Sequence, residues 1–357
     1  MKQPEKTLIV LTPGFAANEA DTTCLPAQQI FIKAINKNFI NIKIIIIAFQ
    51  YPFISSTYQW NGNTIIPLNG KNKSKLSRLI VWFNAWKNLK KINKEDNVIG
   101  LLSFWCTECA FVANYFAKKN SLKHYSWILG QDAREKNKFI KWTKPNGENL
   151  IAMSDFLAAE FYKNYKIKPV YVIPNGIDPS LYNFANSERN IDVLGAGSLI
   201  PLKQYDVFIT VVKELQIRIP RIHAVLCGKG PEEKKINNII NEMNLQNNIT
   251  LTGEKSHPEI LQMMSKSKIF LHTSSYEGFS TVCLEALYAG AHVISFCKPM
   301  NASIKNWHIV NDKNEMIEVA LSILLNPVIK YEPVLFYAMD DSAKKMMHLF
   351  SDNNIIS

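Results

Sequence analysis

The sequence predicts an α/β protein with two Rossmann-like, doubly wound parallel-sheet domains that face each other across a cleft. Its 357 residues are about twice the length of an ordinary domain of roughly 150 residues. Short apolar runs alternate with stretches of helical period, which is typical of a parallel sheet covered by helices. This alternation occurs twice, and the turn formers of 173–179 separate the two series.

Six apolar runs in the first series are expected to be strands, because they are short and bounded by polar residues or turn formers. They are Thr7–Leu11, Ile42–Phe49, Asn97–Leu102, Tyr125–Leu129, Leu150–Met153 and Val170–Ile173. Helical spacing of apolar residues predicts the helices between them at Asp21–Asn38, Lys75–Asn93, Trp105–Lys119 and Ser154–Tyr165.

The second series restarts after the turn formers and again alternates strands with helices. Its expected strands are Ile191–Ala196, Ile222–Cys227, Ile249–Thr252, Ile269–His272 and His292–Phe296. The predicted domains are therefore 1–173 and 191–333, joined by a linker at 174–190. The last segment, 334–357, has helical spacing at Leu335, Phe336, Met339 and Met347. We expect it to form a helix that returns to the first domain.

Composition indicates a folded cytoplasmic protein. Hydrophobic residues make up 47% and charged residues 20% of the chain, as in soluble domains. The apolar run Leu8–Leu11 is too short for a signal peptide, and the run Ile42–Phe49 is too short to span a membrane. The six cysteines indicate reduced thiols. Cys106 and Cys109 form one CxxC, interpreted as two buried helical cysteines because no second pair or histidine cluster accompanies it.

The positive charge is concentrated in the first half. Residues 1–168 hold 24 Lys and Arg against 11 Asp and Glu, whereas residues 169–357 hold 17 against 19. A basic face on one half suggests an anionic partner, such as a phosphate-bearing acceptor, a lipid head group or a membrane surface. Nucleic acid is not expected, because no helix-turn-helix, finger or RNA-binding signature is present.

The segment 71–94 contains eight Lys or Arg and no acidic residue. Its apolar residues recur at helical spacing, at Leu76, Leu79, Ile80, Phe83, Trp86 and Leu89. One interpretation is an interfacial helix that contacts an anionic membrane at its inner face. The other is an ordinary helix that covers the sheet and has a basic outer face.

The strongest local signal for chemistry is the segment Ser274–Gly290. A strand ends near Thr273, a loop carries Glu277 and Gly278, and a helix is expected to open near Phe279 or Ser280 and to end at Gly290. The N–H groups of such a helix start can hold a diphosphate. Glu285 lies eight residues after Glu277, at most ~12 Å along a helix, so one carboxylate could accept hydrogen bonds from a donor sugar and the other from its ribose.

At these residues the sequence resembles the family 4 (group 1) retaining glycosyltransferases of the GT-B fold. Their motif is two glutamates separated by seven residues in the pattern EGFG…EAxAxG, which Glu277 and Glu285 match. The resemblance covers most of the chain. It extends to Ile173–Asp178, to Gly228–Glu232 and to Leu251–Glu254. It implies transfer of a sugar from a nucleoside diphosphate donor, of the UDP or GDP type, to a glycan or lipid-linked acceptor, with no other cofactor and no metal.

The resemblance also implies roles for individual residues. Glu285 resembles the ribose ligand, and Glu277 the carboxylate that contacts donor-sugar hydroxyls and supports the reacting centre. Lys203 resembles the lysine that stabilises the leaving diphosphate. The backbone of Gly278, Phe279 and Ser280 is expected to contact the diphosphate. The remaining donor-side residues are Gly14, Ser198, Gly228, Lys229 and Gly253.

The sequence departs from the family pattern in three places. Ser198 stands where an arginine is usual, five residues before Lys203, which leaves half of the cationic clamp. Ala16 and Ala17 follow Gly14 in place of paired glycines. A histidine common near the donor sugar is replaced within 129–134, where Asp132 is a candidate catalytic residue and Gln131 and Arg134 are candidate acceptor-side residues. The alternative for Asp132 and Arg134 is a surface ion pair.

Competing functions fit the sequence less well. Gly195-Ala196-Gly197 opens like a dinucleotide fingerprint, but Ile200 stands at the third glycine and no acidic residue follows about 20 residues later. Two alternatives to transfer stay open: a nucleotide-sugar-binding protein without transfer, suggested by Ser198, and an epimerase or hydrolase acting on the donor alone. Richness in Ile, Lys and Asn favours an AT-rich bacterial source and a role in surface polysaccharide synthesis.

Overall fold

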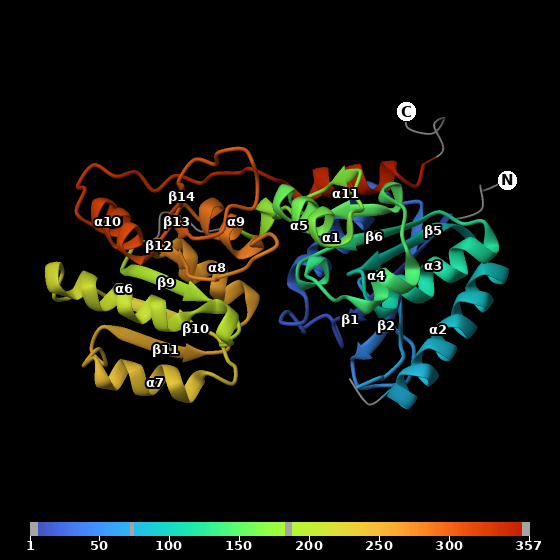
Figure 1. Cartoon of the computed structure of the whole chain (residues 1–357), viewed down its shortest axis with the longest axis horizontal. Coiled ribbons are helices and arrows are strands. Elements are labelled where there is room, and N and C mark those ends of the chain that lie inside the picture. Colours follow the sequence, from blue (N-terminus) through green and yellow to red (C-terminus); the bar gives the residue numbers. More distant parts are fainter. Residues whose placement is uncertain (1–5, 72–74, 183–187, 352–357) are drawn as a thin grey trace. The chain divides into compact units, whose positions relative to one another are not determined.

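The computed structural model describes residues 6–71, 75–182 and 188–351, and the chain divides into two compact units (Figure 1). Unit 1 comprises Met1–Gly176 and Met339–Ser357, and unit 2 comprises Ile177–Ala338. The C-terminal helix thus belongs to the same unit as the N-terminal sheet.

The described part of unit 1 is built on an eight-stranded sheet in the order β3-β4-β2-β1-β5-β6-β7-β8. The strands are β1 (Lys6–Gly14), β2 (Ile42–Tyr51), β3 (Tyr58–Trp60), β4 (Asn63–Pro67), β5 (Asn97–Phe104), β6 (His124–Ile128), β7 (Leu150–Ala152) and β8 (Tyr171–Val172). Only β3 and β4 pair in antiparallel fashion within this sheet. From β1 the chain adds β2, β4 and β3 on one side of the sheet, and it then returns to add β5 to β8 on the other side. The strand order therefore reverses beside β1.

Helices cover both faces of this sheet. They are α1 (Pro26–Asn38), α2 (Lys75–Glu95), α3 (Glu108–Asn120), α4 (Lys138–Thr143), α5 (Asp155–Tyr165) and α11 (Met339–His348), with short 3-10 helices at Gln131–Ala133 and Gly147–Asn149. α2 and α3 share one core with alternate residues of β1, β2 and β5. On the opposite face, Phe31 of α1 packs on Phe104 and Trp127, and α11 packs against α1.

The central strands form because their residues are apolar on both faces. Leu8–Leu11 of β1 and Ile44–Phe49 of β2 are all buried, and Ile9 lies opposite Ile45 in the parallel register. Continuous apolar runs of this kind are what a parallel sheet covered on both faces requires.

Unit 2 contains a six-stranded parallel sheet in the order β11-β10-β9-β12-β13-β14, counted over its described residues. The strands are β9 (Ile191–Ala196), β10 (Ala224–Cys227), β11 (Ile249–Gly253), β12 (Ser267–His272), β13 (His292–Ser295) and β14 (Trp307–Ile309). The chain runs from β9 outwards to β11 on one side and from β12 outwards to β14 on the other. The strand order therefore reverses between β9 and β12.

The helices of unit 2 are α6 (Tyr205–Arg218), α7 (Glu233–Glu242), α8 (His257–Ser265), α9 (Thr281–Tyr288) and α10 (Lys313–Leu324), with short 3-10 helices at Pro179–Leu181 and Pro201–Lys203. Phe208 of α6, Ile236 of α7 and Met316 of α10 share a core with Val193 and Ile269 of the sheet. α8 and α9 contact each other, and α8 also contacts β9 and β12. Figure 1 shows helices over both faces of this sheet.

The expected doubly wound α/β class is confirmed for both units, and every expected strand is present within a few residues of its predicted bounds. The sequence reasoning missed β3, β4, β14 and α4, which have three to six residues each. The β3–β4 hairpin did carry a sequence signal, because the dipeptide Asn61-Gly62 favours a two-residue hairpin turn. Both residues have the positive φ that such a turn requires. No helix in the described ranges is both long and apolar enough to cross a bilayer.

The two cysteines of the CxxC are free and buried. Cys109 lies in α3, whereas Cys106 lies in the turn before it. Burial raises the pKa of both thiols well above the ordinary value, so both are held in the protonated, unreactive form. The expected burial of both cysteines is confirmed, but Cys106 lies before the helix and not within it.

Candidate functional site

The site lies where the strand order of unit 2 reverses, at the carboxyl ends of β9 to β12. Ligands of open parallel sheets bind in the crevice at such a reversal. The loops after β9 and β10 begin at Gly197 and Gly228, and Gly253 is the last residue of β11. A Cβ at Gly228 would lie only 1.9 Å from the carbonyl oxygen of Gly197, and the Gly228 N–H donates to the Gly253 carbonyl at 2.9 Å. The absence of side chains at these glycines therefore lets their backbones pack directly on one another at this edge of the sheet.

An ion pair joins the two loops at this reversal. Nζ of Lys203 lies 2.6 Å from Oε2 of Glu277, and both side chains are largely buried. The Thr273 hydroxyl donates to the carbonyl of Lys203 at 2.7 Å, and the N–H of Ser275 donates to the carbonyl of Leu202 at 3.1 Å. The backbone thus fixes the loop after β9 against the loop after β12, and the ion pair sits on this frame.

His272, at the end of β12, supports Glu277 from the core side. Its Nε2 lies 3.5 Å from Oε2 of Glu277, 3.2 Å from the Ser274 hydroxyl and 3.3 Å from the Ser280 hydroxyl. Its Nδ1 is buried without a hydrogen-bond partner among the described residues. Sequence reasoning treated His272 only as a strand residue, and nothing in the spacing marked it, because its contacts depend on the fold of the following loop.

The pKa values describe a charged carboxylate beside a neutral imidazole. Burial by itself raises the pKa of Glu277, but the contact with His272 and the positive charge of Lys203 bring it down to about 2. Burial holds the pKa of His272 below its ordinary value, although Glu277 opposes this shift and Lys203 reinforces it. Near neutral pH, Glu277 is therefore an anion that accepts hydrogen bonds, and His272 is uncharged.

A second carboxylate lies one helix further along. Glu285, in the second turn of α9, is buried and accepts a hydrogen bond at 2.7 Å from Nε2 of His257, the first residue of α8. Burial lowers the pKa of His257, but the hydrogen bond to Glu285 and the negative charge of Glu285 together outweigh burial, so the net pKa is raised. His257 was also missed. The sequence did carry one signal, because Ser256-x-x-Glu259 is a capping box. A capping box marks the start of a helix and so predicts His257 as the first helical residue.

The helix α9 begins just after the three residues expected to contact a diphosphate. Ser280 is its N-cap but makes no capping hydrogen bond with its side chain, because the hydroxyl faces His272 instead. The segment of Gly278, Phe279 and Ser280 thus leads into the helix with its N-terminus at the site, and the helix dipole there favours an anion. The helix ends before Gly290, which has a φ of +85°.

Lys229 and Ser198 both lie on the surface of the same edge, as their exposure shows. The N–H of Leu199 donates to the Lys229 carbonyl at 3.0 Å, which holds the loops after β9 and β10 together. With a serine at 198, Lys203 is the cation that this loop brings to Glu277.

The candidates in unit 1 occupy different environments. Gly14 ends β1, where the Thr12 hydroxyl donates to its carbonyl. Gln131 and Arg134 are exposed, whereas Asp132 is buried, so Asp132 does not lie at the surface as the ion-pair alternative supposed. The Asp132 carboxylate accepts from the N–H groups of Cys106, Leu129 and Gly130 at 2.8–3.2 Å.

These contacts give Asp132 a structural task, since they tie the loop after β5 to the loop after β6. Burial raises its pKa to about 6, although the three N–H groups oppose the shift. A catalytic role for Asp132, and an acceptor-side role for Gln131 and Arg134, stay predictions.

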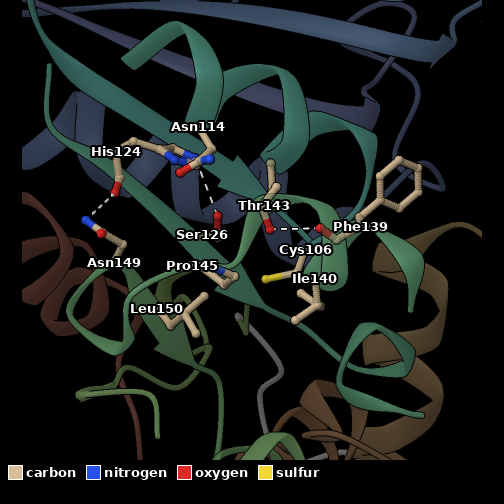
Figure 2. Close-up of a pocket in the computed structure, with 11 residues that line it drawn as sticks. Cys106, Asn114, His124, Ser126, Phe139, Ile140, Thr143, Pro145, Asn149 and Leu150 are labelled. Carbon is tan, nitrogen blue, oxygen red and sulfur yellow. Dashed lines mark hydrogen bonds between the residues drawn. The ribbon is translucent and has the colours of Figure 1, made fainter. Parts of the chain in front are cut away.

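A small cavity with both polar and apolar lining residues lies in unit 1 between α3, α4 and β6 (Figure 2). Its volume is ≈ 10 Å³, about the space of one water molecule. His124 faces it, with Nε2 at 2.8 Å from the Ser103 hydroxyl, and burial lowers the pKa of His124 to about 3. The cavity is too small for a substrate and its histidine is neutral, so the chemistry is placed at the edge of unit 2.

Comparison with known proteins agrees with this geometry. Residues 183–320, which include Lys203, Glu277 and Glu285, match the family model of glycosyl transferases group 1. The chain is 25% identical over 267 residues to the phosphatidylinositol N-acetylglucosaminyltransferase gpi3 subunit of Schizosaccharomyces pombe, covering 71% of this chain and 58% of that protein. It is 28% identical over 219 residues to an uncharacterized glycosyltransferase of Methanocaldococcus jannaschii, covering 59% of this chain and 60% of that protein. The chain thus spans less than two thirds of either relative.

Solved structures show the same fold at low sequence identity. TarM has a TM-score of 0.73 at 12% identity and covers 98% of this chain and 99% of its own. A glycosyltransferase from Rickettsia africae has a TM-score of 0.68 at 18% identity and covers 97% and 94%. HepE from Anabaena, solved in complex with UDP-glucose, has a TM-score of 0.66 at 15% identity and covers 95% and 94%. The fold is therefore that of GT-B glycosyltransferases, and the resemblance to group 1 glycosyltransferases is confirmed.

Proposed function

We propose that the protein is a retaining glycosyltransferase that moves a sugar from a nucleoside diphosphate donor to a hydroxyl of a glycan or lipid-linked acceptor. The observation that carries the proposal is the pair of carboxylates at the reversal point of unit 2, Glu277 with Lys203 and Glu285 with His257. The group 1 match over the same residues supports the transferase class.

We infer a donor of the UDP type as the first to test, with GDP sugars as the second. Relatives are named as N-acetylglucosaminyltransferases, and the structural neighbour HepE was solved with UDP-glucose. UDP-N-acetylglucosamine is thus the first donor to assay.

Each part of the donor has a matching group at the site. Glu285 is placed to accept hydrogen bonds from the ribose hydroxyls, with His257 holding the carboxylate in position. The start of α9 and Lys203 are placed to hold the diphosphate. Glu277, ionised near neutral pH, is placed to accept hydrogen bonds from the hydroxyls of the donor sugar.

The proposed reaction is a front-face displacement. The bond from the anomeric carbon to the phosphate oxygen breaks while the acceptor oxygen bonds to that carbon on the same face. The acceptor proton passes to the leaving phosphate, whose growing negative charge Lys203 stabilises. The reaction thus uses no protein nucleophile, and we expect it to proceed without a metal.

Ser198 supports the runner-up, a protein that binds the nucleotide sugar without transferring it, because a second cation is absent from that position. An epimerase or hydrolase acting on the donor alone is the third candidate. We place the reaction in the cytoplasm of a bacterium, in the synthesis of a surface polysaccharide, on the strength of the composition rich in Ile, Lys and Asn.

Labelled UDP- and GDP-sugars, incubated with and without glycan and lipid-linked acceptors, separate these candidates. We expect release of UDP that depends on the acceptor, with the product keeping the anomeric configuration of the donor. Glu285→Ala is expected to weaken donor binding and Glu277→Ala to depress turnover. Binding without release, or conversion of the donor without an acceptor, would overturn the proposal, as would wild-type turnover in both variants.

A further inference from the structure

The helix α2 has two apolar stripes, and only one of them packs in the core. Val81, Ala85, Leu89 and Ile92 are buried against the sheet and α3. Leu79, Ile80 and Phe83 are exposed, with 56%, 63% and 70% of their surface accessible. Three neighbouring large apolar side chains on one helix are unusual for a solvent-facing surface.

The exposed apolar residues lie on the same face as four lysines of α2. At about 100° per residue, Leu79, Ile80, Phe83 and the four lysines fall within an arc of about 120°, and the buried stripe lies on the other side. The four lysines are Lys87, Lys90, Lys91 and Lys94, all exposed. Within α2, acidic residues are confined to Glu95 at its last position. The outer face is therefore apolar in its first half and strongly basic in its second.

A cluster of aromatic rings extends this face to the neighbouring helix α4. Trp82 of α2 contacts Phe111 of α3 and Phe139 of α4, with ring centroids 4.9 and 6.2 Å apart. Trp142 of α4 packs on Phe111 and Phe139 and is 46% exposed. Nζ of Lys138 lies 5.3 Å from the Trp142 ring.

The arrangement on α4 repeats that on α2, because an exposed tryptophan stands beside Lys138 and Lys141, both exposed. Tryptophan is favoured where one side of a side chain is apolar and the other is wet, and lysine stems can lie along apolar surface with the charge in water. Figure 1 shows α2, α3 and α4 side by side in unit 1.

We propose that one docking face binds the surface of an anionic lipid bilayer. It is defined as Leu79, Ile80, Phe83, Trp142 and the lysines Lys87, Lys90, Lys91, Lys94, Lys138 and Lys141. Lysines attract the negative head groups, and the aliphatic and aromatic side chains enter the boundary with the acyl chains. A phosphate backbone of nucleic acid offers no partner for Leu79, Ile80 and Phe83. A membrane uses both halves of the face, which is why we choose it over a polyanion.

Vesicle co-sedimentation of the full chain tests the proposal, with phosphatidylcholine vesicles that contain or lack phosphatidylglycerol. We expect binding only to the anionic vesicles and weakening by salt. The triple variant Lys87→Glu, Lys90→Glu, Lys91→Glu should bind at least about 100-fold more weakly. The double variant Ile80→Ser, Phe83→Ser should lose binding at unchanged charge.

The matched control reverses three exposed charges on unit 2, in Lys234→Glu, Lys313→Glu and Lys330→Glu, and should bind vesicles like the wild type. Thermal melting confirms that each variant is folded. Equal binding by the α2 triple variant and the control would overturn the proposal. So would binding by the Ile80 and Phe83 variant that equals the wild type, because a purely electrostatic contact would then suffice. Turnover of a soluble acceptor should be unchanged in all variants, so this test is independent of the proposed function.

Discussion

Replacing Lys203 with methionine removes the cation of the ion pair with Glu277 and keeps most of the volume of the side chain. The two charged atoms are 2.6 Å apart and the side chains are 19% and 23% exposed, so solvent screens the pair only in part. The pKa of Glu277 falls from 4.5 to about 2, which corresponds to about 3 kcal/mol in favour of the ionised form. Lys203 shares that effect with His272, so we expect a coupling of about 1–2 kcal/mol between Lys203 and Glu277.

Two measurements follow from this value. In the proposed reaction Lys203 stabilises the leaving phosphate, so kcat for transfer should fall about 100- to 1000-fold in Lys203→Met. Because the folded-state pKa of Glu277 is lowered, its ionisation stabilises the fold above pH 4.5, and this stabilisation is lost as the pH falls towards 2. In Lys203→Met, the free energy of unfolding should depend less on pH within this window.

The double-mutant cycle with Glu277→Gln isolates the pair, and Lys235→Met is the control. Lys235 pairs with Glu232 at 3.1 Å on the surface of unit 2 and is 57% exposed, so solvent screens the pair and its loss should leave both stability and kcat close to wild type. A kcat of Lys203→Met within ten-fold of wild type, with a coupling below about 0.5 kcal/mol, would refute the reasoning.

Three further predictions concern the same edge of unit 2. His257→Ala should raise the dissociation constant of UDP about 5- to 10-fold, because Glu285 loses the hydrogen bond that holds it. Calorimetry at pH 6 and 8 checks this. Since the pKa of His257 is raised, the stabilising effect of its protonated form is complete below pH 6.5 and is lost as the pH rises through the folded-state pKa. Gly228→Ala should destabilise the protein by about 2 kcal/mol or more, since its Cβ would meet the Gly197 carbonyl at 1.9 Å. Gly253→Ala, at a φ of +69° but with open space around the Cβ, should lose only about 1–2 kcal/mol of stability. If thermal unfolding ranks the two variants in the reverse order, the close approach of the loops is contradicted. Transfer measured with excess EDTA should equal transfer without it, and a loss restored by a divalent cation would show that a metal takes part.

The sequence was sufficient for those parts of the fold in which one pattern has one meaning. Continuous apolar runs such as Ile44–Phe49 predict buried parallel strands, because few other elements carry them. The helix α2 shows the limit. Leu79, Ile80 and Phe83 have helical spacing, and so do Val81, Ala85, Leu89 and Ile92. Periodicity alone does not tell which stripe packs on the sheet, and it is the second that does.

The candidate site, like the fold, was predictable only in part. The spacing of Glu277 and Glu285 marked two carboxylates, but their partners come from other strands and helices. His272 is the last residue of a buried strand, and His257 is the first residue of another helix. Only the fold brings their Nε2 atoms within 3.5 and 2.7 Å of the carboxylates. For Asp132 the sequence left a catalytic role and a surface ion pair with Arg134 both open, and neither reading predicted that three backbone N–H groups hold its carboxylate in the interior.

The ion pair between Lys203 and Glu277 has a consequence for the order of events in the proposed reaction. Lys203 is paired with Glu277 in the structure, so in the proposed reaction a diphosphate would compete with Glu277 for the same cation. In the proposed reaction we expect Glu277 to remain ionised after Lys203 moves to the phosphate, because the contact with His272 at 3.5 Å also lowers its pKa. The neutral imidazole can then donate to the carboxylate without adding a charge. With serine at 198, Lys203 alone supplies the positive charge at this loop. In the proposed reaction, Lys203 moves from Glu277 to the phosphate when the donor binds, and Glu277 then accepts hydrogen bonds from the sugar.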